Sequence, residues 1–228
     1  MRMKKTFSSE LAYALGILAI AAATAMMERA GFGMSMVVAP AYVLHLKISR
    51  ALPWYSFGMS EYLLQGALLL ALSAVMGRFR KGYLFSFVTA VLYGLLLDAF
   101  MALIAPLPLG GTAGRVVYYT VGLVVCALGV ALVFHTYIAP EAYELFVKEI
   151  VRKTGGETGR VKTAYDCASC AIAIALSFAF FGFGRFEGVK LGTIVCALVN
   201  GRLIGWIGDA LDRRFAFVDA LPFRKYFE

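Results

Sequence analysis

The sequence predicts an all-α integral membrane protein with six transmembrane helices, arranged as two inverted three-helix repeats. Three observations lead to this prediction. Of the 228 residues, 61% are hydrophobic and 16% are charged, whereas a soluble domain is about half apolar and about a quarter charged. The chain holds six apolar runs, each about twenty residues long, which is the length that crosses a bilayer. The last three runs also repeat features of the first three in the same order.

Each of the six apolar runs is long enough, at about 1.5 Å per residue, to cross about 30 Å of hydrocarbon as a helix. After the fourth span, residues 141–153 place apolar side chains at helical spacing, with acids early and bases late, as the helix dipole favours. We therefore expect an interfacial helix at about 141–153 on the cytoplasmic face and a cytoplasmic tail at 213–228. The spans are expected at 9–29, 55–77, 83–104, 116–136, 164–184 and 188–208.

Two short motifs recur after about a hundred residues. Tyr-Ala-Leu-Gly at 13–16 recurs as Tyr-Thr-Val-Gly at 119–122, and Ala-Leu-Ser at 71–73 recurs at 175–177. Because each copy holds three spans, the second copy enters the membrane from the opposite side, as in transporters built from inverted repeats. The expected repeats are residues 1–108 and 109–212.

The net charge of +8 is distributed as in a membrane protein rather than a nucleic-acid-binding protein. With the N-terminus in the cytoplasm, fifteen lysines and arginines fall in the predicted inner segments and five in the outer segments. This positive-inside bias predicts that both termini are cytoplasmic, that the lipid bilayer is a partner and that nucleic acid is not. The five outer residues are Lys47, Arg50, Arg115, Arg185 and Lys190.

Breaks in the helices are predicted at corresponding positions, after the first and fourth spans. Glycine frees the backbone and proline removes a donor, so a helix ends or kinks at both places. Paired breaks of this kind are the best sequence pointer to a transporter's binding site. The alternative, a surface loop leading into an interfacial helix, stays open. The candidate junction residues are Gly31, Gly33, Ser35, Pro40, Pro140 and Glu141.

Ionisable residues inside the spans are costly unless they pair or meet water, so they are candidate substrate- or ion-binding residues. Glu28, Glu61 and Asp98 are expected at one depth near the outer side, with Gln65 one turn from Glu61 on the same face. Crowded acids raise one another's pKa, which is the condition for a proton or cation site. The alternative is that Glu28 pairs with a base at the interface while Glu61 and Asp98 bond to neighbouring helices.

A second polar cluster is expected near the inner side. Its members are Asp166 on the fifth span, Asn200 and Arg202 on the sixth, and His135 at the end of the fourth. Arg202 needs a partner at this depth, and Asp166 is the nearest candidate. A structural Asp166–Arg202 pair and a site for an anionic group both remain open.

Several of these segments carry a resemblance to a known family. They are the broken junctions, the helix at 141–153, the linker 159–163 leading to Tyr165 and Asp166, and Gly188-x-x-x-Gly192 leading to Asn200. In these features the chain resembles the YitT/YczE-like family of bacterial integral membrane proteins, although that family's proline has no match at Met36. The resemblance covers most of the chain. It implies a multi-pass protein of the bacterial cytoplasmic membrane, described as a permease, and supplies no reaction.

No phosphate-binding loop, nucleophile elbow or HExxH run is present, so we expect no enzymatic activity, no cofactor and no metal site. The expected function is alternating-access movement of a small polar or ionic solute by a secondary transporter or permease. The alternative is a non-transporting membrane subunit, either the substrate-binding partner of an energising module or a regulatory scaffold. The sequence leaves a homo-oligomer open.

Overall fold

The computed structural model describes residues 4–80, 82–156, 158–222 and 224. Three of the basic residues that were assigned to inner segments, Arg2, Lys81 and Lys225, lie outside the described residues. Within the described part, the elements follow one another as β1 (Lys5–Ser8), α1 (Ser9–Ala30), α2 (Ala39–Ile48), α3 (Phe57–Met76), α4 (Gly82–Ile104), α5 (Gly111–Phe134), α6 (Ala142–Thr154), α7 (Thr158–Phe181), α8 (Leu191–Arg214) and β2 (Phe215–Val218).

The predicted class, an all-α membrane protein with six membrane-spanning helices, is confirmed. Helices α1, α3, α4, α5 and α8, together with Arg160–Phe181 of α7, are long and apolar enough to cross a membrane. Helix α5 begins at Gly111 rather than at 116, and α8 continues to Arg214 rather than ending at 208. The short helices α2 and α6 begin just after the two predicted breaks.

Local sequence sets the ends of the spanning helices. Helix α3 begins after Ser56, whose side chain accepts a hydrogen bond from the amide of Met59, and ends at Gly77 with φ of 66°. A serine at the N-cap satisfies an otherwise free amide, and a left-handed glycine stops the last turn. Helix α1 uses the same two devices, with Ser8 at its start and Gly31 at its end.

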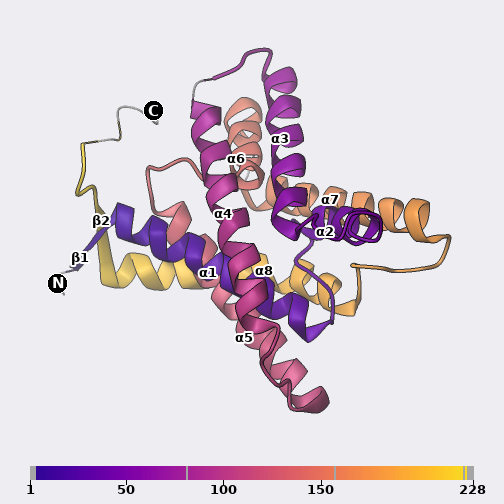
Figure 1. Cartoon of the computed structure of the whole chain (residues 1–228). Helices are drawn as coiled ribbons and strands as arrows, with labels where there is room; N and C mark the ends of the chain where they lie inside the picture. The colour runs from indigo at the N-terminus through magenta and orange to yellow at the C-terminus, as the bar shows by residue number, and fades with distance from the viewer. Residues whose placement is uncertain (1–3, 81, 157, 223, 225–228) are drawn as a thin grey trace.

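Helices α1 and α5 form the central pair, crossing at glycines. A Cβ added at Gly16 would lie 2.9 Å from the carbonyl oxygen of Gly129, and one added at Gly129 would lie 2.8 Å from that of Gly16. Small residues let helix backbones approach closely in a membrane, where packing replaces the hydrophobic effect between helices. Helix α4 packs on α1, and α8 packs on α5. Figure 1 shows α4 crossing over this pair.

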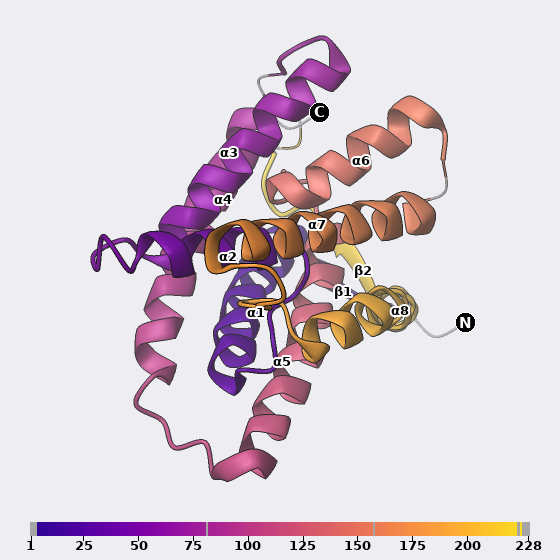
Figure 2. The same ribbon diagram turned by 90° about the vertical axis from the view of Figure 1, so that its right-hand side faces the viewer.

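The short helices connect elements that are distant in sequence. Helix α2 packs against α3 and α7, and α6 packs against α3, α4 and α7. Figure 2 shows α6 lying along α7, with α2 at the other end of α7. Each short helix therefore touches spans from both predicted repeats.

The segment predicted as a tail is paired with the N-terminal strand. Strands β1 and β2 are parallel, with Lys5 opposite Phe215 and Ser8 opposite Val218. The ring of Phe7 packs on Phe215 at 5.4 Å between centroids. The sequence pattern did not indicate this pair, because four-residue strands are too short to show an alternation of their own.

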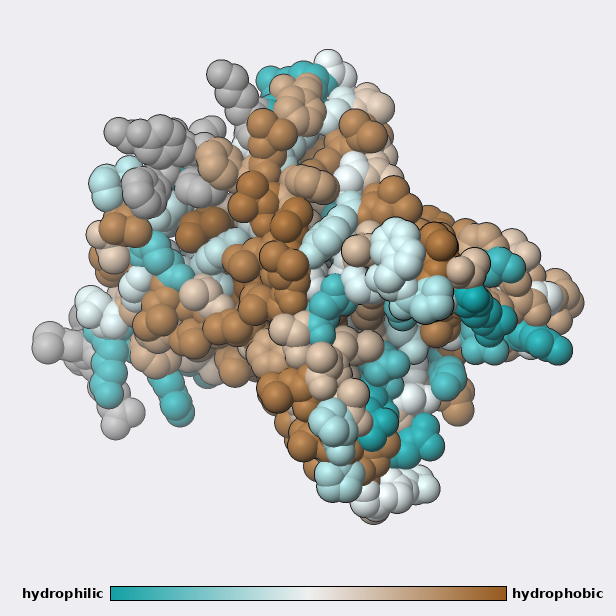
Figure 3. Space-filling model, in the orientation of Figure 1, coloured by the Kyte–Doolittle hydropathy of each residue, from teal (hydrophilic) through white to brown (hydrophobic). Residues whose placement is uncertain are grey.

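Hydrophobic side chains lie on the outside of the molecule. On α4 the side chains of Leu84, Val88, Leu95 and Leu103 are 57–64% exposed, and Figure 3 shows hydrophobic residues gathered over this helix. Water would disfavour so large an apolar face, whereas hydrocarbon would not. The exposed face is therefore the surface that contacts the lipid bilayer.

Candidate functional site

A cavity of about 40 Å³ lies where the two breaks in the helices meet. The first break, residues 31–38, contributes Ser35, Val37 and Val38 to its wall, and the second break, residues 135–141, contributes Glu141. Because a water molecule needs about 10–15 Å³ measured in this way, the cavity has room for about three. We call it the central cavity.

The first break is held by α7 and α8. Gly33 has φ of 110°, and a Cβ there would lie 2.5 Å from the hydroxyl of Thr193, so only glycine fits without displacing α8. The amide of Gly192 donates to the carbonyl of Phe32 at 2.9 Å. The hydroxyl of Ser169 on α7 donates to the carbonyl of Met36 at 2.9 Å. The carbonyls freed by the break thus find donors within the protein.

The second break is held by α4. The hydroxyl of Thr89 donates to the carbonyl of Ala139 at 3.0 Å, and that of Ser86 donates to the carbonyl of Pro140. Thr89 is itself hydrogen-bonded to the hydroxyl of Tyr13 on α1 at 2.7 Å. Each break is therefore anchored by spans from the other predicted repeat.

A buried polar network joins α3 to the second break. The side-chain amide of Gln65 donates to Oε2 of Glu61 at 3.3 Å and to Oε2 of Glu141 at 3.2 Å. Its carbonyl oxygen accepts from the amide of Ala142 at 3.1 Å. The hydroxyl of Tyr143 donates to Oε2 of Glu61 at 2.7 Å. Glu61 and Gln65 are fully buried, and Glu141 is 5% exposed.

A lysine lies beside this network on α7. Lys162 forms ion pairs with Asp166 at 3.0 Å and with Glu144 at 3.7 Å. Lys162 and Glu144 line the central cavity. Lys162 is therefore shared between two carboxyl groups.

Burial and crowding shift the acids outside the spans toward their neutral forms. Burial raises the pKa of the Glu141 carboxyl well above its usual range, and the nearby Glu144 and Glu61 raise it further. The pKa of Glu144 is also raised by burial, while Lys162 acts in the opposite direction. A buried carboxyl without a full counter-charge takes up a proton or a cation instead of remaining ionised.

Two buried acceptor atoms at the central cavity lack a donor. They are Oε1 of Glu141 and Oδ1 of Asn200, and neither has a hydrogen-bond partner among the described residues. The other polar groups of the wall are occupied: the hydroxyl of Tyr93 donates to Thr24 at 3.1 Å, and Thr24 donates to the carbonyl of Ile20 at 2.9 Å. No group of three or more His, Cys, Asp or Glu side chains in the described residues converges as a metal centre would require.

The structure brings together only some of the sequence-predicted site residues. Glu61, Gln65 and Glu141 share the polar network, and Ser35 and Asn200 line the central cavity beside it. Of the inner cluster, Asp166 pairs with Lys162 and, like the exposed Arg202, lines a groove of about 820 Å³ between α7 and α8. This groove shares Lys162 and Ile204 with the wall of the central cavity.

The remaining outer acids have contacts of their own. Asp98 accepts from the hydroxyl of Ser56 at 2.6 Å and from the amide of Gly58 at 2.9 Å, so it fixes the first turn of α3. Glu28 accepts from the hydroxyl of Tyr42 at 3.0 Å and lines a different pocket, of about 100 Å³. Among the described residues, neither acid is hydrogen-bonded to Glu61, although all three were expected at one depth.

Other residues of the predicted site flank the breaks. Gly31 ends α1 with φ of 70°, and Pro40 lies in the first turn of α2. His135 lies at the end of α5, where it pairs with Asp212 at 3.3 Å and packs on the ring of Phe217. Its contacts are therefore with the end of α8 and with β2.

Sequence reasoning missed Tyr143, Glu144 and Lys162. Lys162 was counted only as a topological charge, and Glu144 only as an acid in a helix. A signal for Tyr143 was present, because Ala-Pro-Ala-Tyr at 39–42 recurs as Ala-Pro-Glu-Ala-Tyr at 139–143. The recurrence aligns the two tyrosines and leaves Glu141 as the inserted residue.

Comparison with known proteins gives one match. No curated protein and no solved structure is detectably similar to the chain. A family model described as "Family of unknown function (DUF6198)" matches residues 7–209, which is most of the chain. The match carries no activity and does not name the YitT/YczE-like family. The chain, a membrane-spanning helical protein, therefore belongs to DUF6198, a family of unknown function.

Proposed function

We propose that the protein is a secondary transporter, or permease, that moves a small polar or ionic solute through the central cavity by alternating access. The observation that carries the proposal is that both breaks in the helices supply walls of one cavity, which Glu141, Lys162 and Asn200 also line. Discontinuous helices that meet at a buried site are typical of transporters with inverted repeats. The resemblance to YitT/YczE-like permeases, and with it a place in the bacterial inner membrane with cytoplasmic termini, forms part of the same proposal.

The packing of the helices supports a two-fold relation between residues 1–108 and 109–212. Under this relation α1, α2, α3 and α4 correspond in order to α5, α6, α7 and α8. The contact of α1 with α4 then corresponds to that of α5 with α8, and both contacts occur. The contact of α2 with α7 becomes that of α6 with α3, and both again occur. The pair formed by α1 and α5 maps onto itself. An inverted repeat predicts this pattern.

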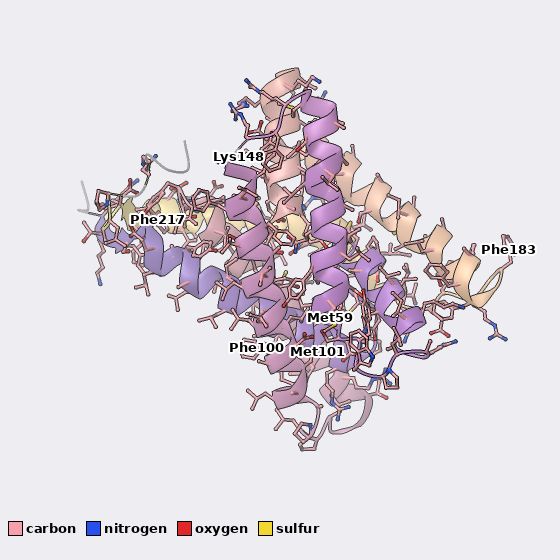
Figure 4. The ribbon with its side chains drawn as sticks, turned by 45° about the horizontal axis from the view of Figure 1, so that its top comes forward. Met59, Phe100, Met101, Lys148, Phe183 and Phe217 are labelled. Carbon is pink, nitrogen blue, oxygen red and sulfur yellow. The ribbon has the colours of Figure 1, made fainter. Side chains whose placement is uncertain are left out.

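Two cross-contacts between the halves lie at the ends of the short helices. Figure 4 labels Lys148 on α6 and Phe183 just after α7, which lie far apart in that view. At the end of α6, the ammonium group of Lys153 donates to the carbonyl of Val75 on α3. At the end of α2, the guanidinium of Arg50 lies 4.5 Å from the ring centroid of Phe181 on α7. In an alternating-access cycle these contacts are the two gates, and they open in turn.

The network assigns roles within the proposal. Glu61 and Glu141, bridged by Gln65, carry the charge that couples transport to an ion, and Asn200 lies on the wall of the cavity through which the solute moves. Asp98 acts through the position of α3 rather than by direct contact. Arg202 lines the groove between α7 and α8 and is not part of the wall of the central cavity.

A second candidate function is a non-transporting membrane subunit, and one observation favours it. The groove between α7 and α8 is wide, and Leu191, Leu198 and Trp206 on α8 are 68–81% exposed. A helix of a partner protein would fit against such a face. If the protein is such a non-transporting subunit, the central cavity never opens to both sides of the membrane.

Cysteine accessibility separates the two functions without knowledge of the solute. The variant Val37→Cys, on a background in which the four native cysteines are replaced, places one thiol on the cavity wall. Alternating access predicts that a charged, membrane-impermeant thiol reagent modifies it in proteoliposomes from either side. Modification from one side only, or from neither, would contradict transport by this route.

The matched control is Val117→Cys on the same background. Val117 is 58% exposed on the outer face of α5, where lipid surrounds it. The impermeant reagent should not modify it from either side, while a membrane-permeant maleimide should. This control shows that labelling at position 37 reports water in the cavity rather than leakage of the reagent.

A further inference from the structure

We propose that the central cavity is a binding site for one small monovalent cation, an alkali-metal ion or ammonium, which Glu141 and Asn200 bind directly. The inference deepens the proposed transport function, and the ion's role as a coupling ion rests on that function. The binding itself is independent of transport and is tested separately.

The chemistry of the unsatisfied atoms selects a cation. Oε1 of Glu141 and Oδ1 of Asn200 are both acceptors and both are buried, and the two residues line the same cavity. A buried acceptor without a donor costs about 1–3 kcal/mol. An anion would worsen both contacts, whereas a positive charge or an N–H donor satisfies both.

Within the described part of the chain, Glu141 has no ion-pair partner. From α7, Lys162 faces the site but is shared between Asp166 and Glu144. From α3, Glu61 adds negative charge, and its own partners are the neutral Gln65 and Tyr143. The other polar wall residues from α1, α4, α5 and the first break are Thr24, Tyr93, Cys126 and Ser35.

Size and ligand type narrow the class of cation. About 40 Å³ holds about three water molecules, so an ion with one or two waters fits and an organic amine does not. Carboxylate, amide and hydroxyl oxygens suit hard cations rather than soft ones. One carboxylate that lacks a counter-charge matches a single positive charge better than a double one.

The direct test is the melting temperature of the purified protein in detergent, measured in sodium, potassium, ammonium and choline chloride at equal ionic strength. We expect at least one small cation to raise the melting temperature saturably, by about 5 °C or more at a concentration far above its dissociation constant. Choline, which exceeds the cavity, should have no such effect. Equal behaviour in all four salts would overturn the proposal.

Two variants locate the site. Glu141→Gln removes the charge and Asn200→Leu removes the amide oxygen, and each should abolish the difference between the small cation and choline. Glu187→Gln is the matched control, because this acid lines the separate pocket next to Glu28, and it should keep the full difference. Should Glu141→Gln fail to fold, Asn200→Leu alone decides the question. A cation effect that survives in Asn200→Leu would place the ion elsewhere.

Protons provide the competing occupant. Since burial and the neighbouring acids raise the pKa of Glu141, lowering the pH should weaken the cation effect in the wild-type protein. A melting temperature that depends on pH through Glu141 but on none of the cations would identify the proton as the occupant, and would contradict the proposal.

The cysteine-accessibility test of transport and the melting-temperature test of cation binding can fail independently of each other. If a cation stabilises the protein but Val37→Cys is modified from one side only, the protein has a cation site and does not transport by this route. Labelling from both sides without a cation effect would leave a transporter that does not use such an ion.

Discussion

The two breaks at the central cavity have the same backbone plan and different chemistry. Ala-Pro-Ala-Tyr at 39–42 follows the first break, and Ala-Pro-Glu-Ala-Tyr at 139–143 ends the second. The first break presents Ser35, Val37 and Val38 to the cavity, while the second presents Glu141. One inserted residue therefore gives one wall of the cavity a charge and leaves the other wall nearly apolar.

The side chains that hold the two breaks also differ in polarity, and the second break again has the more polar one. The recurring Ala-Leu-Ser motif aligns Gln65 on α3 with Ser169 on α7, and each holds one break. Ser169 makes a single hydrogen bond to the first break, whereas Gln65 contacts two carboxylates and an amide at the second. The same backbone arrangement therefore occurs twice in this protein. At the first break it is only supported by a hydrogen bond, and at the second it forms part of a polar network.

The largest expected effect is on the polar bridge. Gln65→Leu should destabilise the protein by about 3 kcal/mol or more, because it leaves the buried Glu141 carboxyl and the Ala142 amide without partners and removes one of the two donors to Glu61. Ser169→Ala, at the aligned position, should cost about 1 kcal/mol. Urea unfolding in mild detergent measures both. Equal costs for the two variants would remove the distinction between the breaks.

The aligned tyrosines give the next comparison. Tyr143→Phe should cost about 2 kcal/mol, because the lost hydrogen bond serves the fully buried Glu61. Tyr42→Phe should cost about 0.5–1 kcal/mol, because Glu28 is half-buried and keeps access to water. The difference in melting temperature between the two variants is the readout. A larger loss for Tyr42→Phe would contradict the burial argument.

Glu141 should also make stability depend on pH. Its pKa is raised in the folded protein, so below its ordinary unfolded pKa of about 4.3 both states are protonated and stability is complete. As the pH rises above that value, the unfolded state loses the proton that the folded state keeps. Stability therefore falls, by up to about 1.4 kcal/mol per pH unit, until the pH passes the folded pKa.

The variant Glu141→Gln is neutral at every pH, so its stability should lack this fall. The comparison is made by thermal unfolding of wild type and variant across the same pH series, in a buffer with choline as the only cation. Parallel curves for the two proteins would show that Glu141 ionises freely in the folded state.

Much of the fold could be predicted from the sequence, because six long apolar runs leave few arrangements other than membrane helices. The breaks were also foreseen, since Gly31, Gly33 and Pro140 act locally on the backbone. The crossing of α1 and α5 at Gly16 and Gly129 was not, because close approach depends on which helix lies opposite.

The site was predicted in part, for a similar reason. Their positions along the second span predicted that Glu61 and Gln65 lie within the membrane. Position along a span does not say which neighbouring helix a side chain faces. Asp98 lies at the end of α4 beside the start of α3, where local capping takes up its oxygens. Lys162 and Glu144 meet only because α6 packs on α7.

The most direct measurement is of the two gates, by pulsed electron paramagnetic resonance on spin-labelled pairs in lipid nanodiscs. One protein carries labels at Arg50→Cys and Phe181→Cys, and another at Val75→Cys and Lys153→Cys, each without the native cysteines. Alternating access predicts a short and a long distance for each pair, with any condition that lengthens one pair shortening the other. A single short distance for both pairs, under every pH and cation condition, would contradict it.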